Sequence, residues 1–179
     1  MFNYLIDLRD SLKKGPGKWQ TRELTDIQHI VIHQALGAKA TAEGVNSYHI
    51  ASTAKGIAYG RGWPRIAYQF FIERNGDTKW CNELTDIVWH AKGANTNGIG
   101  ICVAGNFAGE GHEPDNPLPA YQFNEPTEQQ INSLEILVPD LIAYLNLDIT
   151  ALTTHSKFGK PACPGFVLED WVNQFKVNS

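Results

Sequence analysis

The sequence is poor in cysteine and has no long apolar run, and each of these shortages excludes a class of protein. Three cysteines are an odd number, which argues against the paired disulfides of a small secreted framework. No apolar run approaches the roughly 18–20 residues that a membrane-spanning helix requires. Asp7, Arg9 and Asp10 interrupt the place where a secretion signal would be apolar, so we expect synthesis in the cytoplasm without a signal peptide.

Positive charge is also in short supply. The chain has 15 lysine and arginine residues against 19 aspartate and glutamate residues, which gives a formal net charge of −4. An acidic chain lacks the field that attracts phosphate backbones, so nucleic acid is not an expected partner. With 42% hydrophobic and 19% charged residues, the composition is typical of a globular protein. We expect residues 1–179 to form a single domain and a monomer.

Hydrophobic periodicity divides the chain into strands and helices. Strands are expected at residues 27–34, 66–74, 78–84, 99–105 and 151–156. Helices are expected at residues 2–13, 41–54, 127–147 and 166–176. Residues 106–126 are rich in proline and glycine and are expected to form a long surface loop. This order predicts an α/β fold with a mixed central sheet of about 4–6 strands flanked by helices on both faces.

Short local signals support several of these elements. Asn75 and Gly76 separate two predicted strands and indicate a hairpin turn. Thr127 and Gln130 have the spacing of a capping box at the start of the 127–147 helix. Pro139 lies inside that helix and is expected to kink it or split it in two, because proline removes a backbone donor.

Three residues with metal-binding side chains stand at or after the ends of predicted strands. His33 ends one strand, His155 ends another, and Cys163 lies eight positions later in a loop. Strands that are distant in sequence can be neighbours in a sheet, so these side chains can converge on one ion. Two imidazoles and a thiolate suit Zn²⁺, and three protein ligands leave a fourth position for water, as in catalytic sites. A loop thiol near a histidine is alternatively a nucleophile.

A set of motifs resembles a known family. The pieces IVIHQ, RIAYQFFIERNGDT, HAKGANTNGIGICVAG, TEQQINSLEILV and THSKFGKPACPGF occur in the family's order between about residues 27 and 171. The chain resembles the zinc-dependent N-acetylmuramoyl-L-alanine amidases, which include peptidoglycan recognition proteins and phage endolysins. The likeness is greatest to single-domain phage endolysins. It implies an amidase fold around residues 27–171, with residues 1–26 as an N-terminal helix and extension.

The resemblance implies roles for individual residues. The residues that match the zinc ligands are His33, His155 and Cys163. Tyr68 matches a tyrosine that faces the metal-bound water or the oxyanion, and His90 matches a histidine on the groove wall. Lys160 matches a catalytic lysine, although Pro161 here occupies the family's usual lysine position. Cys102 stands where other branches of the family have a glutamate that acts as general base.

The implied reaction is hydrolysis of the amide bond between N-acetylmuramic acid and L-alanine in peptidoglycan. The cofactor would be Zn²⁺, and the partner would be the glycan strand with its stem peptide. Trp63, Trp80, Trp89 and residues 106–126 are candidates for the groove walls, because aromatic faces pack on sugars and peptides. Such an enzyme acts on the cell wall, in the host periplasm if it is encoded by a phage.

Several alternatives stay open at this point. The first is a peptidoglycan-binding module without activity, although such relatives lack the ligand cysteine that Cys163 provides. The second is a recycling or effector amidase of the same fold. A cysteine hydrolase that uses Cys163 and His155 would need no metal, and a structural zinc site would have no catalytic role.

Overall fold

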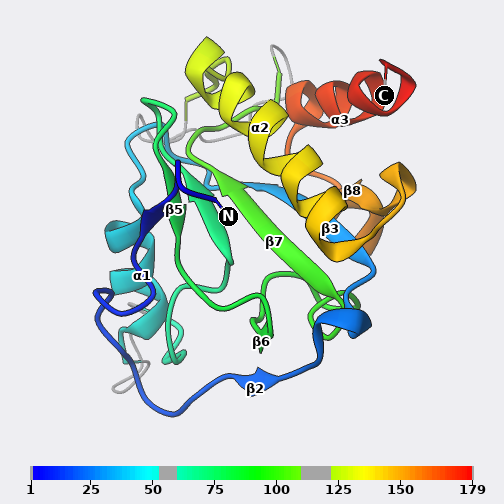
Figure 1. The fold of residues 1–179 in the computed structure, drawn as a ribbon. Coiled ribbons are helices and arrows are strands. Elements are labelled where there is room, and N and C mark those ends of the chain that lie inside the picture. Colours follow the sequence, from blue (N-terminus) through cyan, green and yellow to red (C-terminus); the bar gives the residue numbers. More distant parts are fainter. Residues whose placement is uncertain (1, 53–59, 110–121, 179) are drawn as a thin grey trace.

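A computed structural model describes residues 2–52, 60–109 and 122–178, and Figure 1 shows its fold. Within these residues a six-stranded sheet has the order β1-β5-β4-β7-β3-β8. Its strands are β1 (Ile6–Asp7), β3 (His29–Gln34), β4 (Phe70–Ile72), β5 (Thr78–Trp80), β7 (Gly98–Val103) and β8 (Leu152–Thr154). A small second sheet pairs β2 (Gln20–Thr21) with β6 (Asp86–Ile87). The helices and turns are α1 (Ala42–Ile50), α2 (Glu128–Leu145), α3 (Phe166–Asn178), η1 (Leu24–Asp26), η3 (Ile149–Ala151) and η4 (His155–Phe158).

The main sheet is mixed, as the sequence predicts. β3 is an interior strand next to the edge strand β8, and it pairs in parallel with both β7 and β8. β4 pairs in parallel with β7. β4 and β5 are antiparallel and are joined through the turn at Asn75 and Gly76. Gly76 has a φ of +87°, a conformation that glycine adopts without steric cost, which explains its place in the turn.

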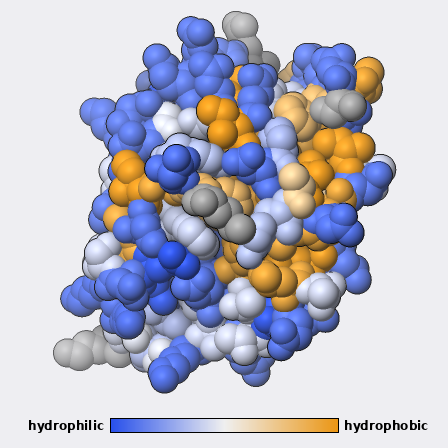
Figure 2. Space-filling view, in the orientation of Figure 1, coloured by the Kyte–Doolittle hydropathy of each residue, from blue (hydrophilic) through white to orange (hydrophobic). Residues whose placement is uncertain are grey.

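Alternation along the strands separates two faces of the sheet. Ile30 and Ile32 of β3 belong to the large core cluster beneath α2 and α3. Val31 and His33 point to the other face, where Phe71 and Cys102 pack with α1. Figure 1 shows α2 and α3 together on one side, away from α1. Figure 2 shows that side, with hydrophobic residues gathered near the end of α2. The expected helices on both faces are therefore confirmed.

Helix α2 forms as its capping box predicts, but it is not split. The Thr127 hydroxyl accepts from the Gln130 N–H at 3.1 Å, and the Gln130 side chain accepts from the Thr127 N–H at 3.1 Å. Pro139 lies inside one continuous helix. Pro139 and Glu135, the residue whose carbonyl loses its helical partner, are both exposed, so proline is tolerated on this side of the helix. The prediction that Pro139 splits the helix in two is therefore wrong.

The predicted helix at residues 2–13 is wrong. Its apolar side chains do not form one stripe, because Phe2 is buried in the α2–α3 core and Leu12 is buried in the α1 core. The segment instead crosses the edge of the sheet as β1, which pairs in parallel with β5. The Leu8 N–H also donates to the Trp80 carbonyl at 2.9 Å.

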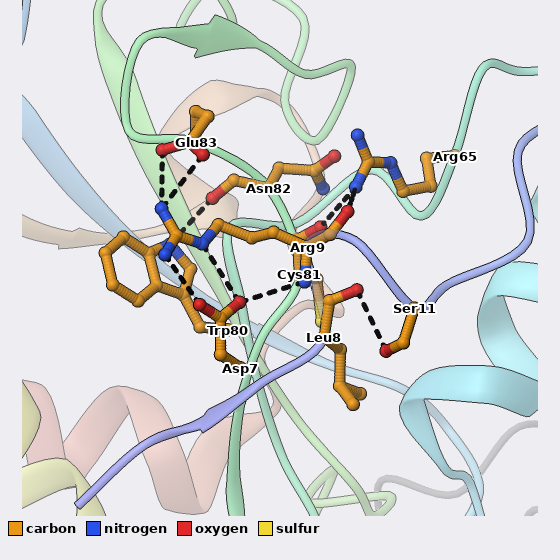
Figure 3. Close-up of polar contacts among 9 residues, drawn as sticks. All are labelled: Asp7, Leu8, Arg9, Ser11, Arg65, Trp80, Cys81, Asn82 and Glu83. Carbon is orange, nitrogen blue, oxygen red and sulfur yellow. Dashed lines mark hydrogen bonds and ion pairs between the residues drawn. The ribbon is translucent and has the colours of Figure 1, made fainter. Parts of the chain in front are cut away.

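Arg9 fastens this N-terminal segment to the sheet, as Figure 3 shows. Its guanidinium donates to Asp7 and to Glu83, with closest N–O distances of 2.6 and 2.7 Å. The same group lies 3.6 Å from the ring centroid of Trp80. The Arg9 carbonyl accepts from Arg65. Tertiary contacts of this kind outweigh a weak helical pattern in a segment that begins with a positive φ at Phe2.

The remaining differences concern boundaries. Helix α1 ends at Ile50, and the last residues of the predicted 41–54 helix lie outside the described part of the chain. Most of the expected loop at residues 106–126 also lies outside it, but Asn106 and Phe107 are buried, so the surface loop does not begin there. No helix among the described residues is long and apolar enough to span a bilayer.

Candidate metal centre and active site

The three predicted ligands come together at the carboxyl ends of two parallel strands of the main sheet. His33 lies near the carboxyl end of β3, and His155 follows β8 directly as the first residue of η4. Because β3 and β8 are parallel neighbours, with Ile32 opposite Thr154, the residues that follow these two lie side by side. Cys163 reaches the same place from the loop before α3.

The distances among these side chains suit a shared ion. One nitrogen from each histidine and the cysteine sulfur all lie within 4.8 Å of one another. The ring centroids of His33 and His155 are 4.4 Å apart. The Cys163 sulfur lies 3.9 Å from His33 Nδ1. The convergence that the strand ends predict is therefore present, and the three side chains can hold one metal ion.

Protonation preferences at the cluster also fit a metal. Burial lowers the pKa of His155 to about 4, and the positive charge of Lys160 acts in the same direction. Burial lowers the pKa of His33 well below its ordinary value. Both rings are neutral near pH 7 and offer a nitrogen lone pair. Burial raises the pKa of Cys163 to about 11, so a bound cation is needed to make it a thiolate. These are donors that zinc accepts.

Gln34, which the sequence analysis did not single out, holds the Cys163 loop in place. It is buried at the end of β3. Its side-chain amide donates to the Ala162 carbonyl at 2.7 Å and accepts from the Phe107 N–H at 2.6 Å. Its backbone N–H donates to Cys163. The available signal was a glutamine inside an apolar strand, since a buried amide must find partners.

Tyr68 lies beside the cluster, as its motif predicts. Its ring centroid is 5.2 Å from that of His33. Its hydroxyl hydrogen-bonds with Cys102, and burial together with the nearby thiols of Cys102 and Cys163 raises the pKa of Tyr68 well above its ordinary value. The hydroxyl therefore keeps its proton near pH 7 and can donate it to a developing negative charge.

Lys160 is exposed on the loop that carries Cys163. Its carbonyl accepts from the Cys163 N–H at 2.8 Å. Its positive charge lowers the pKa of both His155 and Cys163, so the ammonium bears on the cluster although Pro161 occupies the usual lysine position.

His90 does not lie on an open groove wall, because it is buried behind His33. Its Nδ1 is 3.0 Å from His33 Nε2, and its Nε2 is 3.2 Å from the Gly98 carbonyl. Burial lowers the pKa of His90 to about 3. The ring is therefore neutral near pH 7, and the geometry directs it toward the ligand His33.

The tryptophans divide between an exposed row and the core. Trp63 is half-buried, with its ring centroid 4.8 Å from that of His49 and 5.9 Å from that of Trp89. Trp89 is 49% exposed and is available to a ligand. Trp80 packs instead against Arg9 at the β5 edge, away from the row.

Comparison with known protein families assigns the chain to one of them. A family model described as N-acetylmuramoyl-L-alanine amidase matches residues 23–166, which include all three clustered ligand residues. The chain belongs to the N-acetylmuramoyl-L-alanine amidase family. Cys163, which the cluster requires, therefore lies within the amidase region.

Individual relatives agree with this family. The amidase chain is 32% identical to the endolysin of Escherichia phage T7 over 111 residues, which cover 62% of this chain and 66% of that endolysin. The alignment thus spans slightly less than two thirds of the relative. The N-acetylmuramoyl-L-alanine amidase LysC from Clostridium intestinale URNW has a TM-score of 0.65 and 24% identity, and covers 94% of this chain and 97% of its own.

A peptidoglycan recognition protein shares the fold of this amidase-family chain. The structure of peptidoglycan recognition protein-LE in complex with tracheal cytotoxin has a TM-score of 0.74 and 18% identity. The match covers 97% of this chain and 94% of that one. The predicted amidase and recognition-protein architecture is therefore confirmed.

Proposed function

We propose that this protein is a zinc-dependent amidase that cleaves the bond between N-acetylmuramic acid and L-alanine in peptidoglycan, as in endolysin-like cell-wall lysis. The observation that carries this proposal is the cluster of His33, His155 and Cys163 in a chain of the amidase family. We propose that it acts as a single-domain monomer at the cell wall, in the host periplasm if it is encoded by a phage.

The three clustered side chains would hold the zinc ion through two nitrogens and one sulfur. A bound zinc ion supplies a Lewis acid that polarises a carbonyl and lowers the pKa of water. Burial keeps His33 and His155 neutral and so ready to bind a cation. Gln34 holds the Cys163 loop against β3, which keeps the third ligand in reach of the other two.

Tyr68 and Lys160 would act on the scissile amide itself. Cleavage places negative charge on the carbonyl oxygen and requires a proton for the leaving amine. The protonated hydroxyl of Tyr68, next to His33, can donate a hydrogen bond to that oxygen. Loss of such a donor costs on the order of 10²–10³ in rate. The Lys160 ammonium can assist at the oxygen or supply the proton to the amine.

The exposed Trp89 and the half-buried Trp63 support a glycan-peptide as the substrate. The rings of Trp89 and Trp63 are in contact, and the buried ring of His49 joins Trp63 to Tyr68, with a centroid 6.0 Å from that of Tyr68. Aromatic faces bury the apolar sides of sugars and peptides. The related endolysins, and a recognition protein whose structure contains monomeric diaminopimelic acid-type peptidoglycan, support the same substrate class.

A binding module without activity is the main alternative. This alternative is supported by the structural similarity to a peptidoglycan recognition protein, which extends over most of the chain. The clustered thiol of Cys163 favours the enzyme instead, since a binding surface has no need for a third metal ligand.

A product assay tests the reaction. Zinc-loaded protein is incubated with purified sacculi, and the products are analysed by mass and by new amino termini. We expect stem peptides that begin with L-alanine and glycan strands that keep their lactyl acids. Binding to sacculi without new amino termini would support the binding module. Activity that survives chelation but is lost on thiol alkylation would support a cysteine hydrolase that uses Cys163 and His155.

Substitution of the cysteine ligand gives a direct prediction. We expect Cys163→Ser to lose bound zinc, because a hydroxyl is a poor zinc ligand. Loss of a residue that only orients a ligand costs up to about 100-fold, so we expect loss of the ligand itself to lower activity by more than about 100-fold. Cys81→Ala is the matched control, since Cys81 is buried beside β5 and outside the cluster. The measurements are zinc content by elemental analysis and release of amino termini. A fully active serine variant contradicts the assignment.

A further inference from the structure

His90 packs over Gly98 and Gly100 of β7, which have no side chains to occupy the space of its ring. We call this glycine surface the shelf. On the face of the sheet that carries His33, a side chain at Gly100 would place its Cβ 2.9 Å from His90 Cγ. A Cβ at Gly98 would lie 3.3 Å from His90 Cε1. Register places Gly100 opposite Val31 and Cys102 opposite His33, so this shelf adjoins the ligand histidine. The space beside His33 is therefore shaped for an imidazole.

The hydrogen bonds of His90 show which of its two ring nitrogens carries the proton. The Gly98 carbonyl can only accept, so His90 Nε2, at 3.2 Å, carries the proton. In the neutral ring that burial favours, Nδ1 then bears the lone pair. His33 Nε2, at 3.0 Å, must donate to it. A neutral His33 with its proton on Nε2 has its lone pair on Nδ1, the atom 3.9 Å from the Cys163 sulfur.

We infer that His90 is a positioning residue that holds His33 in the tautomer whose Nδ1 faces the other two ligands; this rests on the zinc site proposed above. His33 lies between His90 and the cluster, and the His90 N–H is engaged by the Gly98 carbonyl. His90 therefore acts through His33 and does not itself transfer a proton to the substrate. The carbonyl of Gly98 fixes one end of this chain of hydrogen bonds, and the metal ligand is the other end.

The effect of substitution follows from the acceptor that His33 loses. His90→Phe fills the shelf but offers no acceptor to His33 Nε2, so the ring is free to turn or to change tautomer. We expect zinc affinity to fall by about 10–100-fold, the usual cost of removing a partner of a metal ligand. His90→Asn keeps a side-chain carbonyl near the position of Nδ1, and we expect it to retain more of the affinity than phenylalanine does.

His29→Phe is the matched control. His29 stands on the same strand and the same face as His33, and its ring centroid lies 5.7 Å from that of Phe158. The substitution keeps an aromatic ring at that contact and leaves His33 and its partners untouched. We expect wild-type zinc affinity in this variant.

Two measurements test the inference. The first is the ¹⁵N shift pattern of the His33 ring in metal-free wild-type protein, which is expected to show a protonated Nε2 and an unprotonated Nδ1. The second is the zinc dissociation constant of each variant, measured by competition with a chelator. A protonated Nδ1 in the wild type, or unchanged affinity in His90→Phe, overturns the inference. Absence of zinc binding by the wild type refutes the proposed function, whereas the metal-free ring pattern still decides the role of His90.

Discussion

At the scale of single residues, burial controls the chemistry of the site. Tyr68 keeps its proton because burial and the nearby groups of Cys102 and Cys163 raise its pKa. Lys160 differs, because it is exposed and stands one position before the family's usual lysine position, which Pro161 occupies. The environment of each group therefore indicates how much each one contributes to the reaction.

The first prediction compares these two residues. We expect Tyr68→Phe to lower kcat by on the order of 10²–10³, because the oxyanion loses a donor. We expect Lys160→Ala to lower kcat by less, since an exposed ammonium is screened by water. Tyr48→Phe, at an exposed tyrosine on α1, is the control and should be neutral. Equal losses at Tyr68 and Lys160 would contradict the assignment.

A second prediction concerns pH. Burial lowers the pKa of His49 from 6.5 to about 4, with the charge of Arg61 acting in the same direction, and its Nδ1 accepts from the Ala67 N–H. Between these two pKa values the unfolded chain binds more protons than the folded chain. The free energy of unfolding should therefore fall as the pH drops from about 6.5 to about 4, by up to about 3 kcal/mol for this residue.

His49→Asn isolates that contribution. Its carbonyl can still accept from Ala67, but it does not titrate in this range. Urea unfolding at pH 7 and pH 4.5, in the presence of a chelator, should show a smaller loss of stability in the variant than in the wild type. The same loss in both proteins would show that His49 is not the titrating group.

At the scale of elements, the N-terminal strand depends on side-chain anchors. β1 has two residues and both are exposed, so its two backbone pairs with β5 are weak by themselves. Phe2 packs in one core and Leu12 in the other, which ties both ends of the segment. Arg9 lies between these ties and joins the strand to β5 and the residues after it.

The third prediction removes this anchor. Arg9→Ala should lower the free energy of unfolding by about 1 kcal/mol, because the ion pairs are partly exposed and the cation–π contact is lost. Hydrogen exchange at the Leu8 amide, which donates to the Trp80 carbonyl, should become faster. Lys13→Ala, an exposed charge on the same segment, serves as the control. Unchanged exchange at Leu8 would show that the cores alone hold the strand.

At the scale of the whole molecule, the cluster lies at the carboxyl ends of β3 and β8, in a sheet that is already buried on both faces. Ile30 and Ile32 pack beneath α2 and α3, while Phe71 and Cys102 pack with α1. These contacts do not pass through the metal ligands. The fold should therefore survive without a metal ion.

A chelation experiment checks this expectation. Removal of zinc should abolish activity but leave the far-UV circular dichroism spectrum unchanged. Zinc at 100 times its dissociation constant should add about 2.7 kcal/mol to the free energy of unfolding. Restoration of activity by zinc but not by magnesium is the control. Unfolding on chelation would favour the structural zinc site over the catalytic one.

Elements with local signals could be predicted from the amino-acid sequence. The apolar run around Ile30, the hairpin at Asn75 and the capping box at Thr127 each act within a few residues, and all three appear in the structure. The order of the motifs also predicted that His33 and Cys163 bind the same metal ion. His33 and His155 converge because β3 and β8 end side by side, and Cys163 joins them from the loop before α3.

Features that depend on distant neighbours could be recognised only in the folded chain. The segment around Arg9 became a strand because β5 offered it hydrogen-bonding partners across more than 70 positions of sequence. His90 turned inward because Gly98 and Gly100 leave room for its ring beside His33. Gln34 gained its role because the Cys163 loop returns to β3. Long-range pairing and burial have no local sequence period, so they become visible only when the chain is folded.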